Sequence, residues 1–454
     1  MKATGKFLTG SVDLTTGSPL KKIILFSLPL LLGNILQQLY NTADSIIVGQ
    51  FVGSGALAAV GSSGPIINLM ISFFLGLSAG TSVLISQAYG GRAHDELSRI
   101  TGTVTSVMVL IAAAVSVVGI ALTPTLLGLL NTPADIFDAA AAYMRITFGG
   151  ILFLMLYNVF TGILQGVGDS FTPFIFLVIS CCINIVLDIL FVAGFGWGVA
   201  GAAWATMIAQ AVSVVFGFFR INRSTVGIAL TRENLRIDRK TLGKILRLGI
   251  PIGFQNSLSS IGNLIVQALL NGFGSVIIAA NTAVIKVDSF CTMPMSTFGT
   301  AITVFVAQNL GTGRTDRIRG GVKSALIVSC SISAVISTFL FFFGAYPLRL
   351  FTGEEAVVAA GMDKFRIVAP FYIMMALFNI YSGVIRGCGK TFVPMLVSIL
   401  SMFLGRVPAA WLLSSQLGAN GIHWSLSVCW TLEALAMGLY YYFGHWKKDL
   451  KAVK

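Results

Sequence analysis

The sequence predicts an all-α polytopic membrane protein with about twelve transmembrane helices, arranged as two six-helix lobes related by a pseudo-twofold axis. Three observations predict this fold class: an apolar composition, a succession of long apolar runs and an internal repeat. Apolar residues make up 56% of the chain and charged residues 10%, whereas soluble domains carry roughly a quarter charged residues. With about 20 apolar residues for each crossing, the chain has room for about twelve helices and for no extramembrane domain.

Apolar runs between charged and Gly/Pro-rich breaks place the helices. Six are expected near 23–48, 55–88, 99–122, 140–165, 172–193 and 200–219, and six more near 248–270, 276–309, 323–345, 364–385, 392–414 and 420–444. The chain then divides into a cytoplasmic N-terminal segment (1–22), an N-lobe (23–219), a basic cytoplasmic linker (220–247), a C-lobe (248–444) and a cytoplasmic tail (445–454). The first run is too long for a signal-peptide core.

Lys and Arg residues gather on one side of this topology, which predicts its orientation in the cell (inner, cytoplasmic) membrane. Five connections on the other side, near 49–54, 123–139, 194–199, 271–275 and 414–419, hold no Lys or Arg. Only the segment from Arg349 to Arg366 breaks the pattern. Both termini are therefore expected in the cytoplasm. The formal charge of +13 is scattered among short connections, which argues against nucleic-acid binding.

An internal repeat appears at a shift of about 221 residues, the separation of Asn158 and Asn379. The sequence NVFTGILQGVGDSFTP aligns there with NIYSGVIRGCGKTFVP. Leu28-Pro29 likewise matches Ile250-Pro251, and GVAGAAW matches GANGIHW. Because each repeat holds an even number of helices, both begin on the same side of the membrane, and two parallel lobes facing a central cleft are expected.

Four polar residues of the first lobe are predicted to converge on one site. Carboxylates within a membrane are costly and mark candidate functional sites, and Asp44 and Asp188 lie inside predicted helices. Asn184 is one helical turn before Asp188, and Thr206 lies at similar depth on the next helix. These oxygen donors suit a hard cation such as Na⁺, and two close carboxylates can instead share a proton. The alternative is interhelical hydrogen bonding without transport chemistry.

A polar stripe on the first helix suggests where an organic cation binds. Gln37, Tyr40, Asn41 and Asp44 share one helical face. A simple polar seam between helices explains Gln37 and Asn41 nearly as well. Pro29 removes a backbone hydrogen bond and is expected to act as a hinge toward the cytoplasmic end.

The second lobe lacks acidic residues at the positions that correspond to Asp44 and Asp188, which hold Val266 and Ala409. Its remaining deep charges are Lys286, Asp288 and Arg406. An ion pair between Asp288 and one of these two bases is the simplest expectation.

Taken together, these residues resemble the MATE (multidrug and toxic compound extrusion) family, prokaryotic type. The resemblance covers the whole chain and rests on Pro29, Gln37, Tyr40 and Asp44, on NIVLD ending at Asp188, on GVAGAAWAT ending at Thr206, and on the QGVGD and RGCGK hinges. It implies alternating-access export of organic cations or drugs in exchange for Na⁺ or H⁺, with Asp44, Asn184, Asp188 and Thr206 as the amino-lobe cation site. We also expect no catalysis, no cofactor besides the coupling ion, and a monomer in contact with membrane lipids.

One departure from the family bears on the subtype. The seventh helix reads GFQNSLSS and has no carboxylate there, which places the chain nearer the branch that couples through the amino lobe. A flippase for lipid-linked oligosaccharides, from the same superfamily, would need a basic cleft for pyrophosphate, and the predicted spans hold few bases. A channel or an intramembrane enzyme lacks supporting residues.

The orientation can be tested by cysteine labelling. Cysteines introduced at Gly196 and Gly274 should react with an impermeant reagent outside intact cells, because their connections lack Lys and Arg. Cysteines at Thr231 and Thr315 should react only after permeabilisation. The reverse pattern would overturn the topology.

Overall fold

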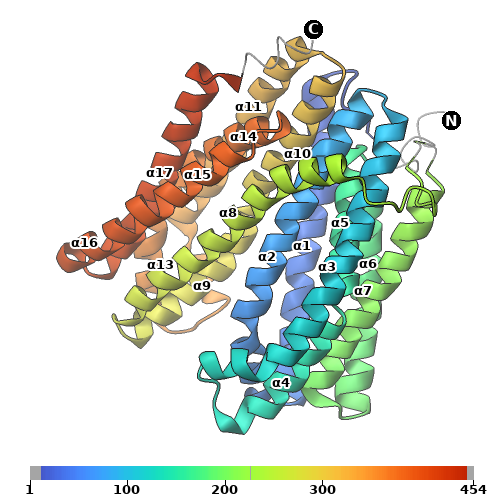
Figure 1. Ribbon diagram of the computed structural model, residues 1–454. Coiled ribbons are helices and arrows are strands. Elements are labelled where there is room, and N and C mark those ends of the chain that lie inside the picture. The colour runs from blue at the N-terminus through green and yellow to red at the C-terminus, as the bar shows by residue number, and fades with distance from the viewer. Residues whose placement is uncertain (1–11, 225, 227, 447–454) are drawn as a thin grey trace, which may run out of the picture. The chain divides into compact units, whose positions relative to one another are not determined.

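The computed structural model describes residues 12–224, 226 and 228–446, and these residues form helices and connections without a strand (Figure 1). The first half contains α1 (Pro19–Phe51), α2 (Ser54–Gly90), α3 (His94–Leu129), α4 (Ala134–Gly149), α5 (Ile151–Gly166), α6 (Phe171–Asp188), the π-helix η1 (Ile189–Gly194) and α7 (Gly198–Asn222). The predicted terminal segments lie partly outside the described residues, at 1–11 and 447–454.

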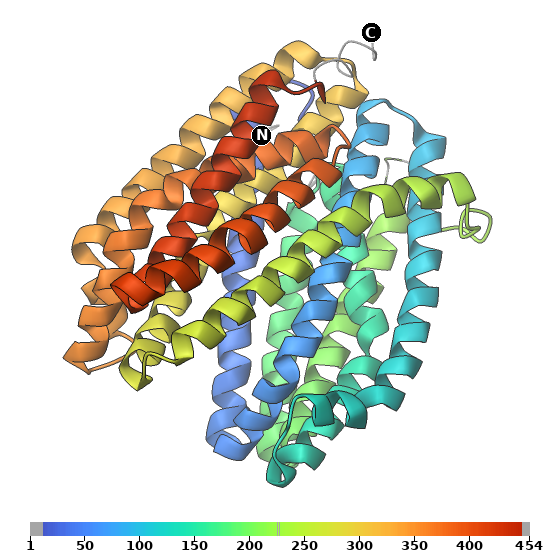
Figure 2. The ribbon, with the colours of Figure 1, turned by 60° about the vertical axis from the view of Figure 1, so that its left-hand side comes forward.

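The second half repeats this order with more interruptions. It contains α8 (Arg239–Asn271), α9 (Ser275–Cys291), α10 (Met293–Gly311), α11 (Thr315–Phe343), α12 (Ala345–Arg349), α13 (Glu355–Val368), the 3₁₀-helix η2 (Ala369–Phe371), α14 (Tyr372–Gly387), α15 (Phe392–Leu400), the π-helix η3 (Ser401–Arg406), α16 (Val407–Leu417) and α17 (Ala419–Phe443). Within each half, the long helices run alongside one another in both views (Figures 1 and 2).

Each predicted apolar run coincides with one helix or with two or three consecutive helices. Ten runs of the described chain are long and apolar enough to cross a membrane, when α4 and α5 are taken as one span bent by 48°. The remaining two runs are α8 and α17, so the all-α, twelve-run prediction is confirmed. The bend at Gly149 and Gly150 was not predicted, although paired glycines are a known cause of kinks.

The chain divides into two compact units. The first consists mainly of Leu28–Gly253, and the second combines Leu14–Ser27 with the chain from Phe254 onward. Each division inside a helix falls within three residues of a proline, Pro29 in α1 or Pro251 in α8. Both helices nevertheless continue through their proline. The bend of α1 at Pro29 stays a prediction, and so do the boundaries of the lobes and of the linker.

Glycines of the repeat permit close helix packing in both units. In α5, a Cβ atom on Gly162 would lie 2.9 Å from the Ser78 carbonyl oxygen of α2. In α14, a Cβ on the corresponding Gly383 would lie 2.4 Å from the Gly299 carbonyl oxygen of α10. Only glycine permits such close approach of two helix backbones. The repeat seen in the sequence is therefore a repeat of helix contacts.

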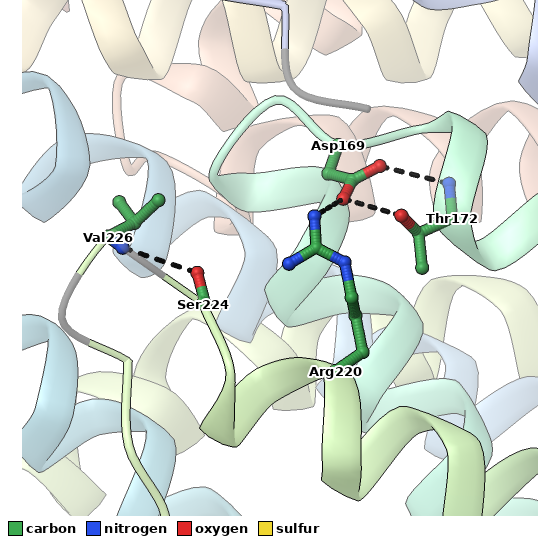
Figure 3. A network of polar contacts seen from close by, with 5 residues as sticks. All are labelled: Asp169, Thr172, Arg220, Ser224 and Val226. Atoms are coloured by element: carbon green, nitrogen blue, oxygen red, sulfur yellow. Dashed lines mark hydrogen bonds and ion pairs between the residues drawn. The ribbon is translucent and has the colours of Figure 1, made fainter. Parts of the chain in front are cut away.

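The hinge that follows α5 is fixed by a buried carboxylate (Figure 3). Asp169 accepts hydrogen bonds from the backbone N–H and the hydroxyl of Thr172, at 2.9 and 2.7 Å, and so satisfies the first turn of α6. Its Oδ2 also lies 3.0 Å from a terminal nitrogen of Arg220 near the end of α7. The same network view shows Val226 N–H donating to Ser224 Oγ beyond α7. Asp169 thus joins the start of α6 to the end of α7.

The conformation of two glycines refines the labelling experiment. Gly196 and Gly274 have φ angles of +67° and +91°, which side chains other than glycine rarely adopt. The adjacent Phe195 and Phe273 are exposed. Cysteines at these two positions test the same connections without backbone strain.

Replacing Arg220 by Gln should destabilise the protein by about 1–3 kcal/mol, because it leaves the Asp169 carboxylate buried without its counter-charge. The matched control is Arg349→Gln, which breaks an exposed pair with Glu355 and should cost less than about 1 kcal/mol. Thermal unfolding of the purified protein in detergent measures both. Equal small losses would mean that the Asp169 network does not hold the hinge.

Candidate functional site

The predicted cation-site residues come together inside the first unit. Asn184 Nδ2 donates a hydrogen bond to Thr206 Oγ1 at 3.3 Å, which joins α6 to α7. The hydroxyl groups of Tyr40 and Thr206 lie 3.2 Å apart, which joins α1 to the same point. Asp44 follows Tyr40 by one helical turn, and Asp188 follows Asn184 by one turn. The four residues that the hairpin and helix-periodicity arguments grouped therefore lie close together in this unit.

The two carboxylates face each other closely enough for their side chains to interact. Asp188 is fully buried, and both of its carboxylate oxygens lack a hydrogen-bond donor among the described residues. One oxygen of Asp44 and the amide oxygen of Asn184 are also buried without a hydrogen-bond donor among the described residues. A hydrogen bond between two carboxyl groups requires a proton on one of them, because two carboxylates have no donor between them. The site therefore offers unsatisfied oxygens to a proton or a cation.

This donor set fits a small hard cation. Two carboxylates, an amide oxygen and a hydroxyl are the ligand types that Na⁺ and similar ions take. Among the described residues, no group of three or more His, Cys, Asp or Glu side chains could hold a metal. The residues that would hold the ion are Asp44, Asn184, Asp188 and Thr206, as predicted, and their ligand role stays a prediction.

The backbone changes its winding directly after Asp188. Residues Ile189–Gly194 form a π-helix, in which each turn holds more residues than in an α-helix. Short π-helical insertions are frequent at functional sites because they turn side chains out of α-helical register. The other π-helix, Ser401–Arg406, does not lie at the corresponding position of the second unit.

A tyrosine that the sequence did not single out also belongs to this site. Tyr143 on α4 lies near both Asp44 and Asp188, as Tyr40 does. Tyr143 packs against a small apolar cluster that includes Val48 of α1 and further side chains of α2, η1 and α7. Two phenol rings therefore flank the carboxylates. Nothing in the spacing of a single aromatic residue within an apolar run could have indicated this.

The predicted substrate stripe separates into two pairs. Gln37 Nε2 donates to Asn41 Oδ1 at 3.3 Å along the exposed side of α1. Tyr40 instead reaches Thr206, and Asp44 reaches Asp188. The bond between Gln37 and Asn41 lies within α1 and so does not decide between substrate binding and a polar seam between helices, whereas Tyr40 and Asp44 face the carboxylate site. Substrate binding by these four residues stays a prediction.

The predicted ion pair of Asp288 with Lys286 or Arg406 is wrong. Asp288 accepts a hydrogen bond from Tyr372 and lies near Lys364. Lys286 is exposed, and Arg406 donates to Asn263 Oδ1 at 2.6 Å. Lys364 belongs to the segment that broke the charge pattern, and it is only 5% exposed, so it is not a loop charge at all.

The bases of the second unit are also more numerous than the predicted spans suggested. Lys364, Arg386 and Arg406 line one cavity there. The expectation of few deep bases, used above against a flippase, is therefore wrong for this unit. The exposed bases of the exceptional segment, Arg349 and Arg366, are paired with Glu355 and Asp363.

Comparison with known proteins identifies the family. The MatE family model matches the chain twice, over residues 29–190 and 251–412, in agreement with the internal repeat. The chain belongs to the MATE family. It is 32% identical to the "Probable multidrug resistance protein YpnP" of Bacillus subtilis, over 96% of this chain and 97% of that protein. It is 26% identical to the "Probable multidrug resistance protein NorM" of Thermotoga maritima, over 94% and 93% of the two chains.

The solved structures agree on the fold. A structure described as the outward-facing conformation of a multidrug resistance MATE family transporter of the MOP superfamily matches this chain with a TM-score of 0.90, at 23% identity, over 98% of each chain. A MATE structure in a bent conformation matches with a TM-score of 0.89 at 23% identity, over 97% of this chain and 98% of that chain. The two-lobe, all-helical MATE architecture predicted above is confirmed.

Ion binding at this site should be measurable without transport. If Na⁺ binds between Asp44 and Asp188, it should stabilise the folded protein by ~2.7 kcal/mol at one hundred times its dissociation constant. Thermal unfolding in detergent should therefore shift upward with NaCl and not with choline chloride at equal ionic strength. The shift should vanish in Asp188→Asn and persist in Asp363→Asn, a change at an exposed carboxylate of the second unit. A Na⁺-independent unfolding temperature would leave the proton as the ligand.

Proposed function

We infer that the protein is a secondary active multidrug efflux transporter of the cell membrane, which exchanges small organic cations for Na⁺ or H⁺ by alternating access. The observation that carries this proposal is the pair of carboxylates Asp44 and Asp188, which have buried, unsatisfied oxygens and lie near two tyrosines, Tyr40 and Tyr143. The multidrug resistance names of the relatives support the drug substrates. Neither of these two relatives is described as a lipid flippase.

The mechanism follows from competition for one negative charge. An organic cation pairs with the carboxylates while Tyr40 and Tyr143 contribute cation–π contacts. Na⁺ or a proton neutralises the same carboxylates, so that occupancy by one ligand lowers the affinity for the other. A gradient that loads the site with Na⁺ or H⁺ from outside therefore expels the drug in that direction.

Movement of α1 would connect this exchange to alternating access. Asp44 is on the part of α1 that belongs to the first unit, and Pro29 lies at the beginning of that part. Because proline weakens the local hydrogen-bond ladder, the segment after Pro29 has two accessible bends at modest cost. The ligand at Asp44 selects between them. Both termini face the cytoplasm, and a monomer within the lipid bilayer contains the complete site.

The deciding experiment is ethidium transport in proteoliposomes with imposed Na⁺ and H⁺ gradients applied separately. The wild-type protein should move ethidium against at least one gradient. Asp188→Asn should abolish gradient-driven transport while remaining folded, because it removes a ligand and one of the two charges. Asp288→Asn should retain more transport, because Asp288 belongs to the second unit and is bonded to Tyr372.

Equilibrium binding separates competition from indirect coupling. Affinity of the purified protein for ethidium should fall as Na⁺ rises at fixed ionic strength, or as pH falls. If neither change alters the affinity, direct competition at Asp44 is wrong, and coupling runs between separate sites.

A further inference from the structure

A cavity of about 770 Å³ lies within the second unit, and its charges differ from those of the first site. Three bases line it: Lys364 from α13, Arg386 from α14 and Arg406 from the end of η3. Two carboxylates line it as well, Asp288 from α9 and Glu433 from α17. When all five are ionised, three positive and two negative charges leave one positive charge in excess. A buried excess charge favours a ligand of the opposite sign.

One base and one carboxylate of the cavity already have partners. Lys364 Nζ donates to Asn281 Oδ1 at 2.8 Å and lies near Asp288. Asp288 accepts from the Tyr372 hydroxyl. This side of the cavity is therefore a closed polar network, in which each charge is held in place.

The two arginines are held by neutral groups and keep donors free. Arg386 donates through one terminal nitrogen to Gln255 Oε1 at 2.7 Å, and Arg406 donates through one to Asn263 Oδ1 at 2.6 Å. The Nε–H of each is buried and has no hydrogen-bond partner among the described residues. Each guanidinium carries five N–H donors. A buried donor without an acceptor costs about 1–3 kcal/mol.

Glu433 does not accept hydrogen bonds from the free donors of Arg386 and Arg406. Its carboxylate interacts electrostatically with both arginines, but its hydrogen bond comes from the hydroxyl of Ser398, at 2.8 Å. Among the described residues, no ion pair within 4.0 Å joins Glu433 to either arginine. The guanidinium groups are therefore near a negative charge without being bonded to it.

We propose that this cavity binds an organic anion, whose carboxylate or phosphate group is held by Arg386 and Arg406. A guanidinium presents parallel N–H donors that match the oxygens of either group. The walls supply the apolar contact that a drug-sized ligand needs, through Met375, Phe378, Met402, Leu426 and Trp430. This site goes beyond the proposed cation exchange, because it gives the protein a second ligand class, anions, at a place separate from Asp44 and Asp188.

The test uses three probes with the same naphthalene ring and different charge: 2-naphthoate, 2-naphthalenemethanol and 2-naphthylmethylammonium. Equilibrium dialysis with the purified full-length protein in a nonionic detergent measures their binding. The naphthoate should bind at least about tenfold more tightly than the neutral alcohol. Arg386→Gln and Arg406→Gln should each remove most of that preference. The control Arg366→Gln, at an exposed arginine of the same unit, should change nothing.

A variant with the opposite expected sign guards against loss of folding. Glu433→Gln removes the negative charge beside the two guanidinium groups, so it should strengthen naphthoate binding several-fold and leave the alcohol unchanged. Competition by dihexanoyl-phosphatidylglycerol distinguishes a lipid from a soluble ligand. If this lipid displaces naphthoate, the cavity binds lipid headgroups; if naphthoate stays bound, the cavity binds soluble anions. Equal binding of naphthoate and alcohol, or weaker naphthoate binding in Glu433→Gln, would overturn the proposal. Asp188→Asn should leave naphthoate binding intact even if cation exchange fails.

Discussion

A charge held away from water must be neutralised by a partner, a proton or a ligand, and the chemistry of both units depends on this constraint. Asp169 meets it permanently, since Arg220 and Thr172 occupy its carboxylate. Asp44 and Asp188 do not, because oxygens of both stay without a donor among the described residues. A permanently paired charge holds helices together. An unpaired one is able to bind a proton or a cation, and this difference separates the structural carboxylate Asp169 from the two carboxylates proposed to take part in transport.

The fold could be predicted almost completely from the sequence because the physics of membrane spanning is simple. A continuous apolar run of about 20 residues has the length of a spanning helix, and a helix satisfies all its backbone groups within one segment in lipid. The interruptions could not be predicted in the same way. The bend between α4 and α5 and the π-helix after Asp188 change neither hydropathy nor charge. Hydropathy locates a span, but it does not report the winding of the backbone inside it.

The candidate site was predictable where a polar residue stood out against apolar neighbours. Asp188 and Asn184 are conspicuous in an apolar helix, and helical spacing relates them directly. Tyr143 is not conspicuous, because tyrosine is common in membrane helices. Lys364 lies in the segment that breaks the predicted Lys/Arg pattern, and the packing shows that its side chain is buried. A violation of the charge rule is therefore a reason to consider an internal base.

The two units show how a duplicated chain can keep its packing and change its chemistry. Gly162 and Gly383 maintain the same close contact between helices, which tolerates no side chain at either position. Polar residues that face a cavity are not restricted in this way, because they touch ligands rather than neighbouring backbones. Among the described residues, the first unit therefore holds carboxylate oxygens without a bonded donor, at Asp44 and Asp188, and the second holds guanidinium N–H groups without a bonded acceptor, at Arg386 and Arg406. Since each charge excess is internal to its own unit, a change that neutralises one leaves the other intact, and the two ligand classes can diverge independently.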